Sequence, residues 1–180
     1  MSKFVSRGGE KLEFAIKHFK IEVKDKICAD FGCSTGGFTD CLLQNGAKKV
    51  YSVDTAYGEL AWKLRNDPRV VVMERTNAMH VSLPEKADLI AIDTGWTKQA
   101  KVIPNALANL KKDGVIVSLI KPHYEAGKNK LGDEEIEAVL EEVKREIVEA
   151  GGEILGIVES PILGGRAGNR EFLVVLRVSS

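Results

Sequence analysis

A glycine-rich segment beside acidic residues is the first part of the sequence whose composition indicates chemistry. It reads Asp30-Phe31-Gly32-Cys33-Ser34-Thr35-Gly36-Gly37 and begins within a short apolar run, residues 27–31, that is typical of a buried strand. Glycines in a strand-to-helix turn let the backbone approach a ligand where a Cβ atom would collide with it. Asp54 closes the next apolar run, about twenty positions after Gly32, which is the spacing of a carboxylate that accepts hydrogen bonds from a ribose. This combination predicts a site for a ribose-bearing cofactor.

The identity of that cofactor follows from the loop pattern and its charge. The segment is not a G-x-G-x-x-G dinucleotide fingerprint, and no Gly-Lys-Ser/Thr follows it as in a P-loop. Asp30 would repel the pyrophosphate of NAD, whereas it suits the sulfonium and ammonium groups of S-adenosylmethionine, which we expect as the cofactor. Asn77, after a third apolar run, is a candidate for the adenine edge and equally a turn residue. The expected contacts are Asp30, Gly32, Ser34, Thr35, Gly36, Gly37, Asp54 and Asn77.

Strand-like and helix-like segments alternate along almost the whole chain. Short apolar runs predict strands at 27–31, 50–53, 70–73, 89–92, 115–120, 154–159 and 172–178. Helical spacing and helix-end signals predict helices at 10–20, 39–45, 58–66, 100–112 and 133–150, with a loop at 122–132. This alternation predicts an α/β fold of Rossmann-like type, with a mostly parallel seven-stranded sheet and helices on both faces. The last connection is too short for a helical crossover, so the final strand is expected to be antiparallel.

Length and composition limit the class of protein. The 180 residues are 44% hydrophobic, and we expect one domain over residues 1–180, with residues 1–26 as an N-terminal helical extension. The 26 basic and 26 acidic side chains balance, which argues against binding nucleic acid by bulk charge alone. No apolar run approaches the ~18 residues of a membrane span, and the cysteines form no C-x-x-C pair. We therefore expect a cytoplasmic protein with neither a membrane segment nor a metal site.

Charge is nevertheless uneven along the sequence. Residues 1–26 carry many basic side chains, whereas the predicted helix at 133–150 is strongly acidic. Two interpretations stay open. In the first, both segments are ordinary solvated surfaces. In the second, the N-terminal region presents a basic face to an anionic partner while the acidic helix is turned away.

Several longer motifs resemble one known family. They are Ser6-Arg7-Gly8-Gly9-Glu10-Lys11-Leu12, residues 30–40, residues 53–60, Lys121-Pro122-His123-Tyr124-Glu125-Ala126-Gly127, and Gly168-Asn169-Arg170-Glu171-Phe172-Leu173. Together they are similar to the TlyA family, which comprises S-adenosylmethionine-dependent RNA methyltransferases of the FtsJ type, some historically labelled hemolysins. The resemblance covers nearly the whole chain from Ser6. It implies a Rossmann-like methyltransferase fold, S-adenosylmethionine as cofactor, and RNA, ribosomal RNA above all, as substrate.

The resemblance also implies a catalytic set. FtsJ-type enzymes methylate the ribose 2′-hydroxyl with a Lys-Asp-Lys-Glu tetrad, which by motif position corresponds to Lys11, Asp93, Lys121 and Glu171. A ribose hydroxyl is a weak acid, so a base must help to remove its proton as the methyl group arrives. Lys121 is the expected base, provided that its pKa is depressed, which partial burial and a nearby cation such as Lys11 would favour. The two carboxylates are expected to orient the two lysines and the hydroxyl.

Two features depart from the family pattern. Family members usually carry a small RNA-binding domain before the methyltransferase, and this sequence is expected to begin where that domain would end. A protein partner is therefore a candidate source of RNA affinity. The family usually has Val-Ser-Phe after the catalytic aspartate, where this chain has Thr94-Gly95-Trp96. Trp96 is expected either to stack on a substrate base or to cover the end of the sheet.

Alternatives to an RNA 2′-O-methyltransferase stay open. A small-molecule O-methyltransferase would need a lid over the strand ends, and only the loop at 122–132 could supply one. A binding module that has lost its activity is disfavoured by the intact Lys-Asp-Lys-Glu set. A hemolytic role has the least support, because no segment is a membrane span or a separate basic amphipathic helix.

Overall fold

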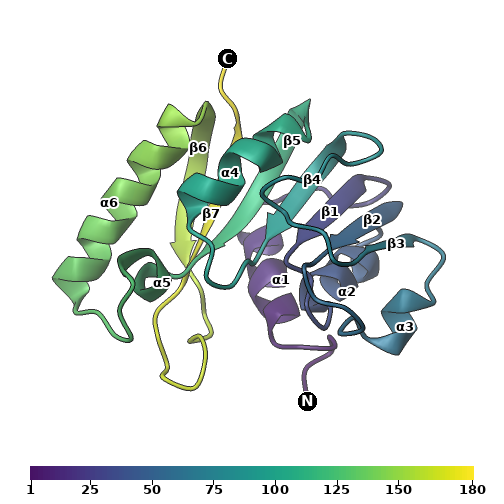
Figure 1. Cartoon of the computed structure of the whole chain (residues 1–180), viewed down its shortest axis with the longest axis horizontal. Helices are drawn as coiled ribbons and strands as arrows, with labels where there is room; N and C mark the ends of the chain where they lie inside the picture. Colours follow the sequence, from purple (N-terminus) through teal and green to yellow (C-terminus); the bar gives the residue numbers. More distant parts are fainter.

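A seven-stranded sheet forms the centre of the protein, as the computed structural model of residues 1–180 shows (Figure 1). In sheet order the strands are β3 (Val70–Met73), β2 (Lys49–Val53), β1 (Ile27–Phe31), β4 (Ala87–Ile92), β5 (Leu110–Ile120), β7 (Phe172–Val178) and β6 (Gly152–Glu159). Strands β1 to β5 pair in parallel, and β7 runs antiparallel to both β5 and β6. The predicted Rossmann-like sheet with its antiparallel final strand is confirmed.

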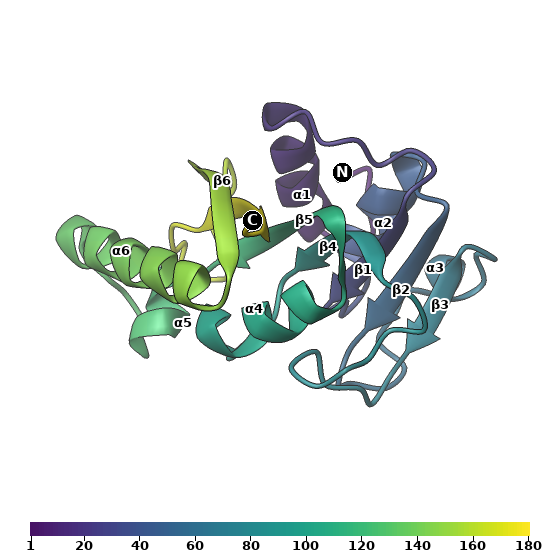
Figure 2. The same cartoon turned by 90° about the horizontal axis from the view of Figure 1, so that it is seen from above.

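Helices cover both faces of this sheet (Figure 2). One face carries α1 (Gly8–His18), α2 (Gly37–Gln44) and the short α3 (Trp62–Arg65). The other face carries α4 (Gln99–Ala108), α5 (Pro122–Ala126) and α6 (Asp133–Glu149). Because α1 and α6 lie on opposite faces, the basic N-terminal segment and the acidic helix are on opposite sides of the protein, as one of the two interpretations requires.

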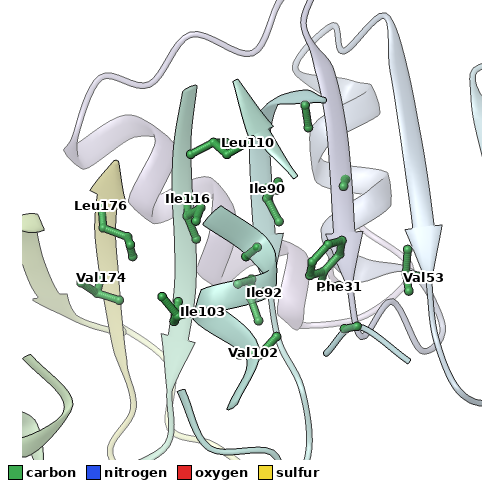
Figure 3. Packing of buried hydrophobic residues seen from close by; sticks show 14 of the residues in the cluster. Phe31, Val53, Ile90, Ile92, Val102, Ile103, Leu110, Ile116, Val174 and Leu176 are labelled. Carbon is green, nitrogen blue, oxygen red and sulfur yellow. The ribbon is translucent and has the colours of Figure 1, made fainter. Parts of the chain in front are cut away.

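The alternation of side chains along the strands builds two cores. In β4, Ile90 and Ile92 belong to the core under α4 and α6, whereas Leu89 and Ala91 belong to the core under α1 and α2. The first of these cores is shown in Figure 3. Each fully buried aliphatic side chain stabilises the fold by about 1.5–3 kcal/mol, so the two layers hold the strand ends rigidly in place.

Several predicted elements have different bounds in the structure. The helix predicted at 100–112 ends at Ala108, because the strand pairing of Ala87 with Leu110 begins β5 earlier than its apolar run suggests. The helix predicted at 58–66 is shorter, and the loop predicted at 122–132 contains α5. Pro122 stands at the start of α5, where its fixed φ angle favours a helix and its missing N–H is not needed.

The helices also bear on membrane insertion. None of them combines the length and the apolar character that a bilayer-spanning segment requires.

Candidate active site

The site lies at the edge of the sheet where the parallel strands end. Asp54 directly follows β2, Asp93 follows β4 and Lys121 follows β5. Because β7 is antiparallel, Glu171, the residue before it, reaches the same edge. The order of the strands reverses between β1 and β4, and this is where open α/β sheets bind their ligands.

Two adjoining hollows open at this edge. The smaller, of about 270 Å³, lies between the start of α1 and the glycine loop, and the larger, of about 470 Å³, lies beside the ends of β2 and β4. Gly32, Ser34 and Asp93 line both hollows, which therefore form one depression around the loop. The predicted cofactor contacts in the smaller hollow are Asp30, Gly32, Ser34, Thr35 and Gly37, and those in the larger are Gly32, Ser34, Asp54 and Asn77.

Two glycines of the loop, Gly32 and Gly36, have a positive φ angle and pack against different neighbours. Gly32 has a φ of +86°, and a Cβ atom there would collide with the carbonyl oxygen of Asp93, so the loop passes directly against the end of β4. Gly36, with a φ of +104°, lines neither hollow. A Cβ atom on Gly36 would instead collide with Leu60 and Leu64, which places this residue against the segment around α3.

Asp30 is fully buried at the floor of the smaller hollow. Its Oδ2 atom accepts hydrogen bonds from the backbone N–H of Thr39 at 2.9 Å and from the Thr39 hydroxyl at 2.8 Å. Its Oδ1 atom is buried and has no protein partner. Burial raises the pKa of Asp30 to about 7, although the bonds from Thr39 lower it. Asp30 therefore fastens the first turn of α2, a role that the Thr39 hydroxyl nine positions later could have suggested.

Asp54 and Asn77 stand at the larger hollow in different ways. The carboxylate of Asp54 accepts the backbone N–H groups of Ser34 at 2.7 Å and Ala56 at 2.9 Å, which ties the glycine loop to the end of β2. The side-chain oxygen of Asn77 accepts the backbone N–H of Met79 at 2.9 Å. Asn77 is thus a turn residue that also lines the hollow, so both interpretations of it fit its position.

The four residues of the implied catalytic set form two ion pairs. Lys11 of α1 lies 2.6 Å from Glu171, and Lys121 lies 2.6 Å from Asp93. The Glu171 carboxylate is 2% exposed, and the loop between β6 and β7 closes over it at Gly164, where a Cβ atom would collide with the carboxylate. The sheet edge therefore brings together residues that lie far apart in the sequence.

The expected depression of the Lys121 pKa is wrong. Burial does lower the pKa of Lys121, but the charge of Asp93 and its hydrogen bond, together with the charge of Glu171, outweigh burial and raise the pKa above its ordinary value. The Lys11 cation, which the sequence predicts to lower this pKa, is itself paired with Glu171. The structure therefore holds Lys121 as an ammonium ion at neutral pH.

An aromatic pair that the sequence only half predicted lies beside Lys121. The rings of Trp96 and Tyr124 are stacked with centroids 4.7 Å apart, and the Lys121 nitrogen lies 5.3 Å from the Tyr124 ring centroid. Trp96 is 86% exposed, so it does not cover the sheet end as a buried side chain would. The sequence assigns no role to Tyr124, because residues 122–132 are predicted to be a loop, whereas α5 turns this ring towards Trp96.

The depression fits S-adenosylmethionine in charge and in shape. Asp30, whose buried Oδ1 atom has no protein partner, places an acidic side chain beside the smaller hollow, where a cationic group would favour its charged form, and Asp54 lines the larger hollow, where a ribose would need it. Gly32 and Asp93 approach each other closely where the two hollows adjoin, and both residues line both hollows. An elongated ligand with a cationic end and a nucleoside end therefore suits both halves.

Comparisons with known proteins point in the same direction. The model of the FtsJ-like methyltransferases matches residues 4–178. TlyA of Mycobacterium tuberculosis, a 16S/23S rRNA (cytidine-2′-O)-methyltransferase, is 42% identical over 189 residues, covering 98% of this chain and 69% of that protein. YqxC of Bacillus subtilis, a proposed rRNA methyltransferase, is 44% identical over 188 residues, covering 97% of this chain and 66% of that protein.

Solved structures include a proposed hemolysin of Streptococcus thermophilus. It matches with a TM-score of 0.94 and 40% identity, covering 100% of this chain and 69% of that protein. The chain thus spans about two thirds of the length of these relatives.

Proposed function

The chain belongs to the FtsJ-like methyltransferase family, whose methyl donor is S-adenosylmethionine, and we propose that it methylates a ribose 2′-hydroxyl of ribosomal RNA. We call the two adjoining hollows the donor site, because they would hold the methyl donor. The observation that carries the proposal is that both ion pairs, Lys11–Glu171 and Lys121–Asp93, lie at the edge of this donor site. Two lysines and two carboxylates suit a reaction that must remove a proton from a weakly acidic hydroxyl.

The proposed base is Lys121 in its uncharged form. When bound, S-adenosylmethionine supplies an electrophilic methyl group on a positively charged sulfur. Lys121 takes the proton of the 2′-hydroxyl, and Asp93, 2.6 Å away, stabilises the ammonium ion that results. The raised pKa makes Lys121 a stronger base but leaves less of it uncharged at neutral pH. Positive charge bound in the adjoining hollow would lower that pKa and increase the uncharged fraction.

The other members of the set act as orienting groups in this proposal. Glu171 holds the ammonium of Lys11, whose side chain is 11% exposed and lines the smaller hollow at the same edge as Lys121. A fixed ammonium can donate a hydrogen bond to the ribose and hold its hydroxyl in line for transfer, which is the proximity part of catalysis. The target base would stack on the exposed ring of Trp96, supported from behind by Tyr124.

The substrate and setting are also part of the proposal. Ribosomal RNA is favoured because the named activities of the TlyA and YqxC relatives are on rRNA, and such a substrate would place the protein in the cytoplasm. With no net charge to attract RNA, a protein partner that supplies affinity fits the same proposal. We treat residues 1–180 as one methyltransferase domain, in which residues 1–26 form a helical extension that carries Lys11.

Labelled methyl transfer followed by alkaline hydrolysis tests the proposed function. The protein would be incubated with methyl-labelled S-adenosylmethionine and ribosomal RNA. Alkali cleaves RNA through a free 2′-hydroxyl, so a 2′-O-methylated nucleotide survives within a dinucleotide. We expect the label in alkali-resistant dinucleotides. Label only in mononucleotides would indicate base methylation, and absence of label in rRNA would remove rRNA as the substrate.

A further inference from the structure

The first residues of the chain form one wall of the smaller hollow. Residues 3–9, here named the N-terminal strap, place Ser6, Arg7 and Gly8 in its lining, opposite Asp30 and the glycine loop. The strap reaches this place by crossing the first turn of α2, close to where Figure 1 marks the N-terminus. A part of the donor site is therefore made by a segment that no strand of the sheet holds.

The strap is packed too closely onto α2 to tolerate side chains at the contact. A Cβ atom on Gly37 would collide with the Ser6 hydroxyl and would lie 2.9 Å from the Gly9 nitrogen. A Cβ atom on Gly9 would lie 2.5 Å from the Phe4 ring, which is itself buried. The strap therefore lies close against the start of α2 at Gly37, and Phe4 packs on Gly9 within the strap, so a small displacement of the strap would change the shape of the hollow.

A buried carboxylate on α2 fastens this contact. Asp40 is 3% exposed, and its Oδ2 atom accepts the backbone N–H of Val5 at 2.8 Å. The Nε2 group of Gln44, one turn further along, donates to Asp40 Oδ1 at 3.1 Å and to the carbonyl oxygen of Lys3 at 3.0 Å. The Lys63 ammonium lies 3.4 Å from the same Oδ2 atom. Asp40 therefore links α2 to the strap, yet it lines neither hollow.

We propose that Asp40 is a positioning residue for the donor site, which sets the affinity for S-adenosylmethionine by holding the N-terminal strap as the wall of the smaller hollow. The Val5 N–H and the Gln44 amide both point at this one carboxylate, so neutralising it weakens the attachment of the strap at two places. Asp40 does not touch the hydroxyl-activating pair Lys121–Asp93. Its loss should therefore weaken donor binding and leave the chemical step intact once the donor is bound. The inference rests on the proposed function only in taking S-adenosylmethionine as the ligand.

The test compares Asp40→Asn with Lys63→Met. The first variant neutralises the carboxylate that accepts the Val5 N–H, whereas the second removes the charged side chain beside Asp40 and leaves that carboxylate and the strap unchanged. Calorimetric titration with S-adenosylmethionine should give a Kd raised roughly tenfold for Asp40→Asn, the loss of one hydrogen bond to a charged group, and a Kd close to the wild-type value for Lys63→Met. Equal donor affinity in all three proteins would overturn the inference.

Two further readouts separate positioning from loss of structure. With ribosomal RNA, Asp40→Asn should raise the KM for the donor and keep kcat near the wild-type value, whereas a partly unfolded protein would lose kcat at unchanged KM. Trypsin should cleave after Arg7 faster in Asp40→Asn than in wild type, and saturating donor should slow that cleavage in wild type. A fall in kcat alone, or cleavage after Arg7 at the same rate in both, would contradict the proposal.

Failure of the proposed function is distinguishable from failure of this inference. A wild-type protein that binds the donor but does not label rRNA would refute the proposed substrate, and the donor affinities of the two variants would still decide the role of Asp40. A wild-type protein that does not bind the donor would refute both.

Discussion

The two lysine–carboxylate pairs of the site have the same length and different surroundings. Nitrogen and oxygen are 2.6 Å apart in both. The Lys11 and Glu171 side chains are 11% and 2% exposed, and the loop at Gly164 closes over the carboxylate. The Lys121 and Asp93 side chains are 17% and 27% exposed, and Asp93 lines both hollows. The first pair links α1 to the residue before β7 and places Lys11 in the lining of the smaller hollow, whereas the second pair is the more exposed one and reaches both hollows through Asp93.

The largest effect should come from removing the accessible lysine. Lys121→Met should lower the methyl-transfer rate roughly 10²–10⁴-fold, the usual contribution of a general base, while S-adenosylmethionine binding stays near its wild-type value. Single-turnover transfer to rRNA and calorimetric titration of the donor measure the two quantities. Lys111→Met is the matched control, because that lysine pairs with Asp88 at 3.2 Å, away from both hollows. Transfer at the control's rate would exclude Lys121 as the base.

Neutralising the carboxylate of each pair should lower the stability of the protein by different amounts. Glu171→Gln leaves the nearly buried Lys11 cation without its counterion, and should lower the free energy of unfolding by about 3 kcal/mol. Asp93→Asn disrupts the more exposed pair and should cost about 1 kcal/mol or less. Urea denaturation of both variants measures the two costs. The reverse order would show that burial does not distinguish the pairs.

A change in the donor site should leave both pairs intact. Asp54→Ala removes an acceptor for the ribose and frees the backbone N–H groups of Ser34 and Ala56, so donor affinity should fall roughly tenfold. Asp67→Ala is the control, because Asp67 binds only Arg69 at the surface. Calorimetry would contradict the assignment if both variants bound the donor equally well.

The sequence predicts the fold and the position of the site better than it predicts the protonation state of the residues in the site. Strand-ending Asp54, Asp93 and Lys121 follow from the apolar runs, because parallel strands end at one edge. The raised pKa of Lys121 does not follow, because it depends on which carboxylate lies closest after folding. Proximity to the Lys11 cation predicts a depressed pKa for Lys121, but that cation forms an ion pair with Glu171.

Local packing accounts for the other differences. Gly36 looks like a cofactor glycine in the sequence, yet it packs against Leu60 and Leu64 across the loop. The sequence also does not predict the proposed role of Asp40, because its partner at Val5 is a backbone N–H group. A side-chain pattern carries no signal for a contact of that kind.

The pH dependence of transfer tests the assignment of Lys121 as base most directly. Only the uncharged amine can accept the hydroxyl proton, and the raised pKa of Lys121 makes that form scarce at neutral pH. The single-turnover rate of the wild-type protein should therefore rise with pH through the neutral and into the alkaline range. In Asp93→Asn the carboxylate no longer favours the ammonium, so the rise should move towards lower pH, with a lower maximum. A wild-type rate that does not change with pH, or an unshifted profile in Asp93→Asn, would contradict the account.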